Sequence, residues 1–453
     1  MGFSRRLASS FALAGTCALL LLVNCSDDEQ STNPTPDSGT AGDGAVGEGG
    51  AAEDGDVPPL VVCSSPLRMD TSFGQGGIAS EALVGPVDPP DHVLPLADGR
   101  LLVYGFRALD RLLPTGAHDP SFNLDPKLAA RLTSSSSSSD LTLCRGAIAP
   151  GNGSILACTG DEGARDGLFV YRLREDGSLD PSYGSEGVAA LYLDGRDGAA
   201  TTDIRAEQEL VTTSDGVSYV FGALTPSGAQ TGVHDAFVAR LTSSGVLDPS
   251  FAGGKGYFVA GSPTKDTPAL GALRPDGKLT FAMRTKFPGS GGITSVYLIR
   301  PDGTTDEAYG DAGAIELADS VLLQQLPSGD LLIQDAQYLS KRLSTGQPDV
   351  SFGDAGRVSL DDGTNDQYSA FAHFGDGSAV VLGAWDGTSS LRRFDAHGKP
   401  CGERFTLPAI PAQNAVFSSI TTGPDGAIYI GFLAYEPSTE GERRTRFIFK
   451  IVQ

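Results

Sequence analysis

An aspartate recurs along the chain in the motif Asp-x-Ser-Phe/Tyr or a close variant. Carboxylates repeated in this way could act as metal ligands or could stabilise turns. The six copies are Asp70, Asp119, Asp180, Asp248, Asp306 and Asp349. Carboxylates could bind calcium, which takes about six to eight oxygen ligands. An Asp in a turn can instead accept hydrogen bonds from backbone N–H groups two or three residues on. Because the same group stands in nearly every repeat, we expect the structural role.

Other candidate ligands and catalytic groups are scattered. Three acidic loops lack the alternating oxygens and closing Glu of a calcium loop; they are residues 161–166, 194–197 and 361–366, with Asp361 to Asp366 as the best candidate. No two histidines have zinc-ligand spacing, and neither a Gly-x-Ser-x-Gly elbow nor a phosphate-binding Gly-Lys-Ser/Thr loop occurs. We expect no catalytic residue and no cofactor, with calcium as the alternative.

Two single residues, His373 and Trp385, could have either a structural or a functional role. His373 falls on the first strand of its repeat, near the expected centre of the fold, and a histidine with its hydrogen bonds satisfied is the simpler interpretation than catalysis. Trp385, the single tryptophan, precedes the Asp386-Gly387 turn. An exposed indole there could stack on a sugar, but a plain surface residue is the simpler interpretation.

The cysteines indicate an oxidising compartment. Cys17 lies in the apolar leader and Cys25 at its end, which leaves four cysteines in the rest of the chain. An even number in an exported chain predicts two disulfides. Cys144 and Cys158 lie at nearly equal distances on either side of the turn Pro150-Gly151-Asn152-Gly153, so we expect them opposite each other on paired strands. Cys63 and Cys401 then pair by elimination.

The elements that carry these residues repeat roughly every 55 residues, within the range of propeller blades. Each repeat has a hairpin, a strand ending in Arg-Leu, the Asp motif and a fourth strand; in the last copy Cys401 replaces the Asp. Asn-Gly or Asp-Gly between short apolar runs is the strongest local hairpin signal. The hairpin turns are Asp98-Gly99, Asn152-Gly153, Asp215-Gly216, Asp276-Gly277, Ser328-Gly329, Asp376-Gly377 and Asp425-Gly426.

Seven repeats of four strands predict an all-β protein: a seven-bladed β-propeller with four-stranded antiparallel blades and almost no helix. A solenoid is the alternative, but neither end of the array resembles the polar cap that it needs. The motif aromatics should pack between neighbouring blades; they are Phe73, Phe122, Tyr183, Phe251, Tyr309 and Phe352.

The chain ends should close the ring, because otherwise two unpaired sheet edges stay exposed. The first repeat begins at its Asp motif and the strand around Ile78, and it lacks the strand that should come before. The last segment, Phe447 to Val452, is such a strand. We therefore expect the strand at Ile78 to be the outer strand beside Phe447 to Val452 in one composite blade.

The motif DGSLDPSYG at residues 176–184 resembles the delta-60 repeat of large secreted bacterial proteins. The resemblance runs from about Leu67 to the C-terminus, and four of the seven copies match well. It implies the propeller fold. It implies no defined molecular role.

The N-terminus has the features of an export signal. Arg5 and Arg6 precede an apolar stretch that is too short for a comfortable membrane span. The stretch ends in Leu-Val-Asn-Cys25, which resembles the lipobox of bacterial lipoproteins, although Asn24 departs from the usual small residue. The resemblance implies a signal peptide over residues 1–24 and lipidation of Cys25; ordinary cleavage is the alternative. Residues 25–59 predict a disordered acidic tether, and residues 60–453 the propeller.

The net charge of the chain bears on which classes of partner it can bind. Its net charge is −23, so a phosphate backbone would be repelled and we expect no nucleic acid partner. We expect a monomeric, exported, lipid-anchored protein of the bacterial cell envelope, at the outer membrane or cell surface, that binds protein or glycan and is not an enzyme. One alternative is a glycan hydrolase or lyase with carboxylates, or a His and a carboxylate, at the channel mouth. Another is a structural envelope component without a ligand.

Overall fold

The computed structural model describes Cys63 and residues 65–453, with internal gaps at 84–91, 106–108, 134–141, 162–165, 196–197, 199, 207–209, 230–232, 262–264, 288–290, 319–320, 336, 361–366, 386–387, 411–414 and 439–440. Three predicted features lie outside the described residues: the signal segment 1–24, the tether 25–59 with Cys25, and the acidic loop 361–366. In the part that is described, no helix is long and apolar enough to cross a membrane.

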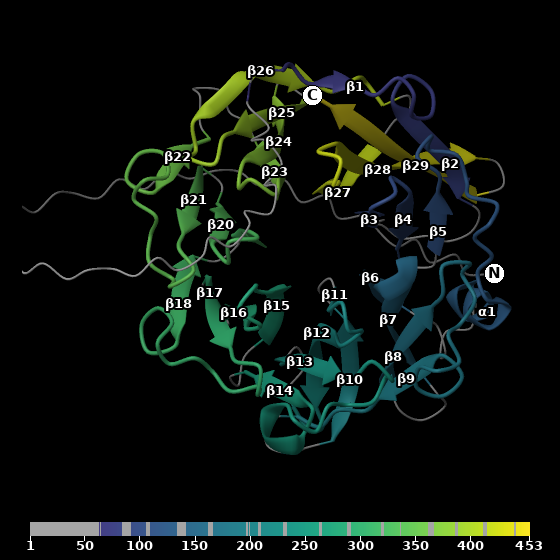
Figure 1. The fold of residues 1–453 in the computed structure, drawn as a ribbon, viewed down its shortest axis with the longest axis vertical. Helices are drawn as coiled ribbons and strands as arrows, with labels where there is room; N and C mark the ends of the chain where they lie inside the picture. Colours follow the sequence, from purple (N-terminus) through teal and green to yellow (C-terminus); the bar gives the residue numbers. More distant parts are fainter. Residues whose placement is uncertain are drawn as a thin grey trace, which may run out of the picture. The chain divides into compact units, whose positions relative to one another are not determined.

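Seven antiparallel sheets form a ring (Figure 1). Blade 1 contains β3 (His92–Pro95), β4 (Leu101–Tyr104) and β5 (Leu109–Leu112). Blade 2 contains β6 (Thr142–Ala149), β7 (Gly153–Asp161), β8 (Asp166–Leu173) and β9 (Val188–Leu191). Blade 3 contains β10 (Thr201–Ala206), β11 (Val211–Thr212), β12 (Ser218–Pro226), β13 (Asp235–Leu241) and β14 (Tyr257–Ala260).

The other four blades complete the ring. Blade 4 contains β15 (Lys265–Leu273), β16 (Leu279–Lys286), β17 (Gly292–Ile299) and β18 (Ala314–Ala318). Blade 5 contains β19 (Leu322–Gln325), β20 (Leu331–Gln334), β21 (Tyr338–Arg342) and β22 (Arg357–Ser359). Blade 6 contains β23 (Gln367–His373), β24 (Ala379–Trp385), β25 (Thr388–Phe394) and β26 (Pro400–Thr406). The closing blade contains β1 (Arg68–Met69), β2 (Ile78–Leu83), β27 (Ala415–Thr422), β28 (Ile428–Ser438) and β29 (Gly441–Val452).

The terminal strands pair as the repeat phase predicted. β2 runs antiparallel to β29, with Ile78 opposite Phe449 and Ser80 opposite Phe447. β1 continues the same pairing, with Arg68 opposite Val452. The composite closing blade is therefore confirmed, and Figure 1 shows the purple N-terminal strands beside the yellow C-terminal ones.

The motif aromatics join neighbouring blades, also as predicted. Phe73 packs in one cluster with Val93 and Leu101 of blade 1. Tyr183, which follows blade 2's third strand, packs with Phe237 of blade 3. All six rings are buried: Phe73, Phe122, Tyr183, Phe251, Tyr309 and Phe352. Burying a ring of this size stabilises the fold by roughly 1.5–3 kcal/mol, so each of these six junctions has its own apolar anchor.

Blade 1 departs from the prediction of four strands, because its described residues form three. In blade 2 the motif aromatic is followed by Gly184, whose φ is +58°; a Cβ there would lie 2.1 Å from the carbonyl oxygen of Val188. Asn123 holds the equivalent position in blade 1, and no fourth strand follows it. The helix α1 (Pro126–Thr133) takes that place instead. Pro126 suits the first turn of a helix, and α1 buries Leu128 and Leu132 at the junction with blade 2.

The predicted hairpin turns form at six of their seven positions. In those six, the glycine has a positive φ, from +74° at Gly426 to +85° at Gly216 and Gly329. The turn of blade 2 differs: Gly151 and Asn152 have φ values of +75° and +59°, and Gly153 is extended. The turn is thus displaced by one or two residues towards Gly151. Asn152 can take the left-handed conformation that glycine has in the other six turns, because Asn tolerates positive φ.

Candidate functional site

The motif aspartates close turns and hold cations. Asp180 Oδ1 accepts hydrogen bonds from the backbone N–H (3.1 Å) and the hydroxyl (2.7 Å) of Ser182. In blade 1, Asp119 Oδ2 accepts a hydrogen bond from Arg111 Nε at 2.8 Å. Burial opposes ionisation of Asp119, but the hydrogen bonds from Ser121 and Arg111 outweigh it and lower its pKa to about 2. These carboxylates are therefore engaged within the fold.

The same pattern runs round the ring, but the partner of the motif Asp is an arginine in some blades and a lysine in others. A cation faces each motif Asp: Lys450 for Asp70, Arg111 for Asp119, Arg172 for Asp180, Arg240 for Asp248, Lys278 and Arg300 for Asp306, and Lys341 for Asp349. The arginine also reaches the next blade, since Arg172 Nη1 donates to the carbonyl of Ser243 at 3.0 Å. Among the described residues, no cluster of three or more His, Cys, Asp or Glu side chains could hold a metal ion.

Both predicted disulfides are present in the structure. Cys144 and Cys158 are opposite each other in the β6–β7 pairing, with Cα atoms 4.2 Å apart. Cys63 and Cys401 have Cα atoms 4.9 Å apart. Cys401 stands where the other repeats carry the motif Asp, and the disulfide connects blade 6 to the start of the closing blade.

The two singled-out residues lie at strand ends. His373 ends β23, and burial lowers its pKa despite a hydrogen bond between Nδ1 and the Phe374 carbonyl at 3.1 Å. Its own carbonyl accepts a hydrogen bond from Thr422 Oγ1 at 2.5 Å. His373 therefore joins blade 6 to the closing blade. Trp385 ends β24 opposite Thr388, and the Asp386-Gly387 turn lies outside the described residues.

A cavity of about 420 Å³ lies at the centre of the ring. Its walls come from blades 1, 4, 5, 6 and the closing blade, mainly from their first strands. Leu322 and Phe417 supply apolar surface, and Gln324 and Ser418 supply hydrogen-bonding groups. Arg284 Nη2 donates to the Val321 carbonyl at 3.1 Å, so this wall cation is already held by the protein.

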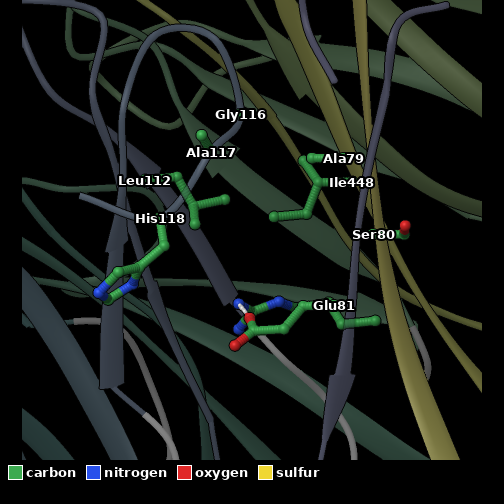
Figure 2. Close-up of a pocket in the computed structure, with 9 residues that line it drawn as sticks. Ala79, Ser80, Glu81, Leu112, Gly116, Ala117, His118 and Ile448 are labelled. Carbon is green, nitrogen blue, oxygen red and sulfur yellow. Dashed lines mark hydrogen bonds and ion pairs between the residues drawn. The ribbon is translucent and has the colours of Figure 1, made fainter. Parts of the chain in front are cut away.

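A second pocket, of about 180 Å³, lies where the closing blade meets blade 1. Figure 2 shows Ala79, Leu112 and Ile448 around one part of the pocket and Glu81 and His118 around another. We call it the closure pocket. Its walls come from β2, β29 and the turn after β5, so the pocket exists only because the two chain ends meet.

Charged groups link the walls of the closure pocket. Arg446 of β29 is buried and pairs with Glu81 opposite it on β2. Arg446 Nη2 also lies 3.7 Å from Asp110 Oδ2 of blade 1, and Asp110 Oδ1 lies 2.8 Å from His118 Nδ1. The side chain of Arg446 is 3 % exposed and that of His118 61 % exposed, so the chain of contacts runs from the interior to the surface.

A third pocket, of about 450 Å³, lies between blades 4 and 5. We call it the rim pocket. Glu316 of β18, Arg342 of β21 and Gln347 of the next turn line it. Sequence reasoning had singled out none of these residues, nor Glu81 and Arg446. The expected pairing of the chain ends contains the signal for the latter two, since it sets Glu81 opposite Arg446.

Comparison with known proteins agrees with the fold and adds little beyond it. Residues 227–251 match the family described as "Domain of unknown function (DUF5122) beta-propeller". No curated protein matches the sequence. Among solved structures, the chain is similar to the polysaccharide lyase Uly1, with 12 % identity, coverage of 84 % of this chain and 93 % of that chain, and a TM-score of 0.42.

Two further structures show the same range of similarity. Prolyl oligopeptidase B from Galerina marginata has 10 % identity and a TM-score of 0.43, with 81 % of this chain covered. The chain spans 55 % of the length of that oligopeptidase. A protein of unknown function from Dyadobacter fermentans has 9 % identity and a TM-score of 0.38, with 68 % of this chain and 94 % of that chain covered.

Proposed function

We propose that the protein is an exported binding module: a monomeric propeller with delta-60 repeats, held at the bacterial cell envelope by a lipid on Cys25 and an acidic tether over residues 25–59. The apolar leader and the Leu-Val-Asn-Cys sequence support the export and the anchor. Stable anchoring needs more than one acyl chain, and bacterial lipoproteins of the kind that this leader resembles carry several. The tether would set the propeller away from the membrane and leave its faces accessible.

The central cavity carries the binding proposal. It combines apolar walls with a few hydrogen-bonding groups, which is typical of sites for small ligands and chain segments. Leu322 is 40 % exposed there, although leucine is usually buried. Gln324 Nε2 already donates to the Phe371 carbonyl at 2.7 Å, so a ligand that covers Leu322 and Phe417 and donates to Gln324 Oε1 would gain both apolar contact and orientation. A protein segment or a glycan has this mixed chemistry.

The cavity favours binding over catalysis. Its titratable wall groups are Arg284 and His92. Arg284 is bonded to the Val321 carbonyl, and the ring of His92 is stacked on Tyr104 with centroids 5.1 Å apart. General acid–base chemistry needs a group within hydrogen-bond reach of the reacting atom, and these two are committed to the scaffold.

A binding screen tests the proposal. The full chain, purified in detergent, is applied to an array of cell-envelope glycans and to a peptide library. Leu322→Glu puts a charge on the apolar cavity wall and should weaken binding of any hit at least about tenfold, or about 1.4 kcal/mol. Val350→Glu is the matched control, because Val350 is 75 % exposed in a turn outside the cavity. Equal effects of the two substitutions, or no hit on either array, would contradict the proposal.

A further inference from the structure

We propose that the closure pocket and the rim pocket, which lie at the same kind of blade junction, are two subsites for a neutral polyhydroxyl ligand, a single sugar residue. They are separate from the central cavity, and each lies between an outer strand and the turn of the next blade. A ring of repeats with ligand pockets at equivalent junctions would be a multivalent glycan-binding protein.

The two pockets occupy the same place in the repeat. In each, the glycine after the motif aromatic donates its N–H to a threonine carbonyl of the next blade: Gly74 to Thr115 at 2.7 Å, and Gly310 to Thr345 at 3.2 Å. The wall from the next blade follows directly, with Ala117 in the closure pocket and Gln347 in the rim pocket. The repeat therefore places both pockets at the same kind of junction.

A second glycine at each junction keeps the pocket floor close to the outer strand. Gly116 has φ +80°, and a Cβ there would lie 3.0 Å from the side chains of Phe73 and Ala79. Gly346 has φ +90°, and a Cβ there would lie 3.1 Å from Ile315. Larger residues would push the turn away from the strand and open the pocket. The apolar floor is thus preformed in both places.

Each pocket is lined by a carboxylate from the outer strand and by an arginine. In the closure pocket Glu81 pairs with Arg446 of the same blade, whereas in the rim pocket Glu316 comes from β18 of blade 4 and Arg342 from β21 of blade 5. A carboxylate only accepts hydrogen bonds and a guanidinium only donates them, whereas a hydroxyl does both. Adjacent hydroxyls on one ring can therefore use both groups at once, while the C–H face of the ring lies on the apolar floor.

The same chemistry disfavours charged ligands. An anion would face the carboxylate of each pocket and a chain with a net charge of −23. A cation would compete with an arginine that is already in place. In the closure pocket, Arg446 Nη1 is buried and has no hydrogen-bond partner among the described residues. A hydroxyl or ring oxygen would satisfy such a donor without adding charge.

Ligand-observed NMR and calorimetry on the full chain test this assignment. The neutral probes are glucose, galactose, mannose and N-acetylglucosamine; glucosamine and glucose 6-phosphate are the charged counterparts. At least one neutral sugar should bind with two equivalents per chain, and each charged counterpart at least about tenfold more weakly. Ala117→Trp and Gln347→Trp, which fill one pocket each, should each remove one equivalent, and the double variant should remove both.

Two controls keep the outcome interpretable. Val246→Trp places the same indole at the equivalent exposed turn position of blade 3 and should leave both equivalents intact. If a Trp variant fails to fold, Glu81→Gln and Glu316→Gln remove the carboxylate charge at constant size and should weaken binding at their own pocket about tenfold. Leu322→Glu, in the central cavity, should change neither site. Failure of every neutral sugar to bind, binding that survives the double Trp variant, or stronger binding of a charged counterpart would overturn the proposal.

Discussion

Arg393 Nη2 donates a hydrogen bond to the backbone carbonyl of Ser65 at 2.6 Å, although the two residues are 328 positions apart in the chain. Arg172 makes the equivalent bond to Ser243 in the next blade along the chain. Ser65, near the N-terminal end of the described chain, thus takes the place that Ser243 has in the turn after β13. The junction between blade 6 and the closing blade has the same design as the others, with a disulfide in place of an Asp.

The first prediction concerns the C-terminal strand. Deleting residues 447–453 removes half of β29, so Ile78 to Ser80 of β2 and Ile428 to Phe432 of β28 lose their partners on that strand. The whole ring should lose stability, because both edges that the strand had closed become exposed. Thermal unfolding should show one transition at a lower temperature, and hydrogen exchange should rise in all blades. Faster exchange confined to β2, β27 and β28 would contradict this expectation.

The second prediction compares the two disulfides. Cys63–Cys401 closes a separation of 338 residues and Cys144–Cys158 one of 14. In the chain-entropy model the longer loop stabilises by about 3 kcal/mol more. Urea unfolding of Cys63→Ala/Cys401→Ala and of Cys144→Ala/Cys158→Ala should show the larger loss for the first pair. A larger loss for the second pair would show that local packing outweighs loop closure.

A third prediction restores the repeat motif in blade 6. Arg393 is buried, and that burial lowers its pKa. Cys401 stands opposite it, at the position where its counterparts have the motif Asp. Cys63→Ala/Cys401→Asp should place an Asp opposite Arg393. It should be more stable than Cys63→Ala/Cys401→Ala by about 1.5–3 kcal/mol, the range for hydrogen bonds to charged groups. Equal urea midpoints for the two variants would show that position 401 does not reproduce the motif geometry.

The fourth prediction is a pH dependence. The folded-state pKa of Asp119 and of Asp306 is about 2, below the ordinary value of 3.8. A lowered carboxyl pKa contributes stability that is complete above the unfolded value and is lost as pH falls through the folded value. Stability should therefore decrease between about pH 4 and pH 2, and Asp119→Asn should reduce that slope. Urea midpoints measured across this range check the slope; a profile unchanged by Asp119→Asn would contradict it.

The fifth prediction concerns the anchor. Mass spectrometry of the native protein should find an acylated N-terminal cysteine at Cys25, and Cys25→Ser should move the protein out of the membrane fraction. Cys17→Ser is the control, since Cys17 would leave with the signal peptide. An unmodified N-terminus at another residue would refute lipidation, and Asn24 is the position at which the sequence departs from the usual lipobox.

The sequence predicted the fold because the repeat carries redundant signals. Turn glycines, buried aromatics and the Asp motif recur in step, and the incomplete first repeat showed how β2 would meet β29. Blade 1 escaped prediction because the segment after Phe122 continues into the helix α1 instead of the turn that precedes a fourth strand in blade 2. The turn at Gly151 is displaced, since Asn152 and Gly151 can both adopt positive φ.

The candidate pockets were harder to predict than the fold. Each pocket joins residues from separate repeats, such as Glu81, His118 and Arg446 in the closure pocket, so no local motif describes it. The repeat pattern predicts which strands are neighbours, but the cavity depends on how closely a turn approaches the next strand. That distance is set by side-chain size at Gly116 and Gly346, which a strand-level prediction does not resolve.

Ring closure by β2 and β29 is the central structural claim, and engineered cysteines test it most directly. Ser80 and Phe447 are opposite each other in the β2–β29 pairing, and opposite residues of antiparallel strands have Cβ atoms about 4.5–5.5 Å apart. Under mild oxidation, Ser80→Cys/Phe447→Cys should form a third disulfide, and non-reduced peptide mapping should recover residues 80 and 447 in one cross-linked peptide. Cross-linking of Ser80→Cys with Leu102→Cys in the first hairpin, and none with position 447, would contradict the closure.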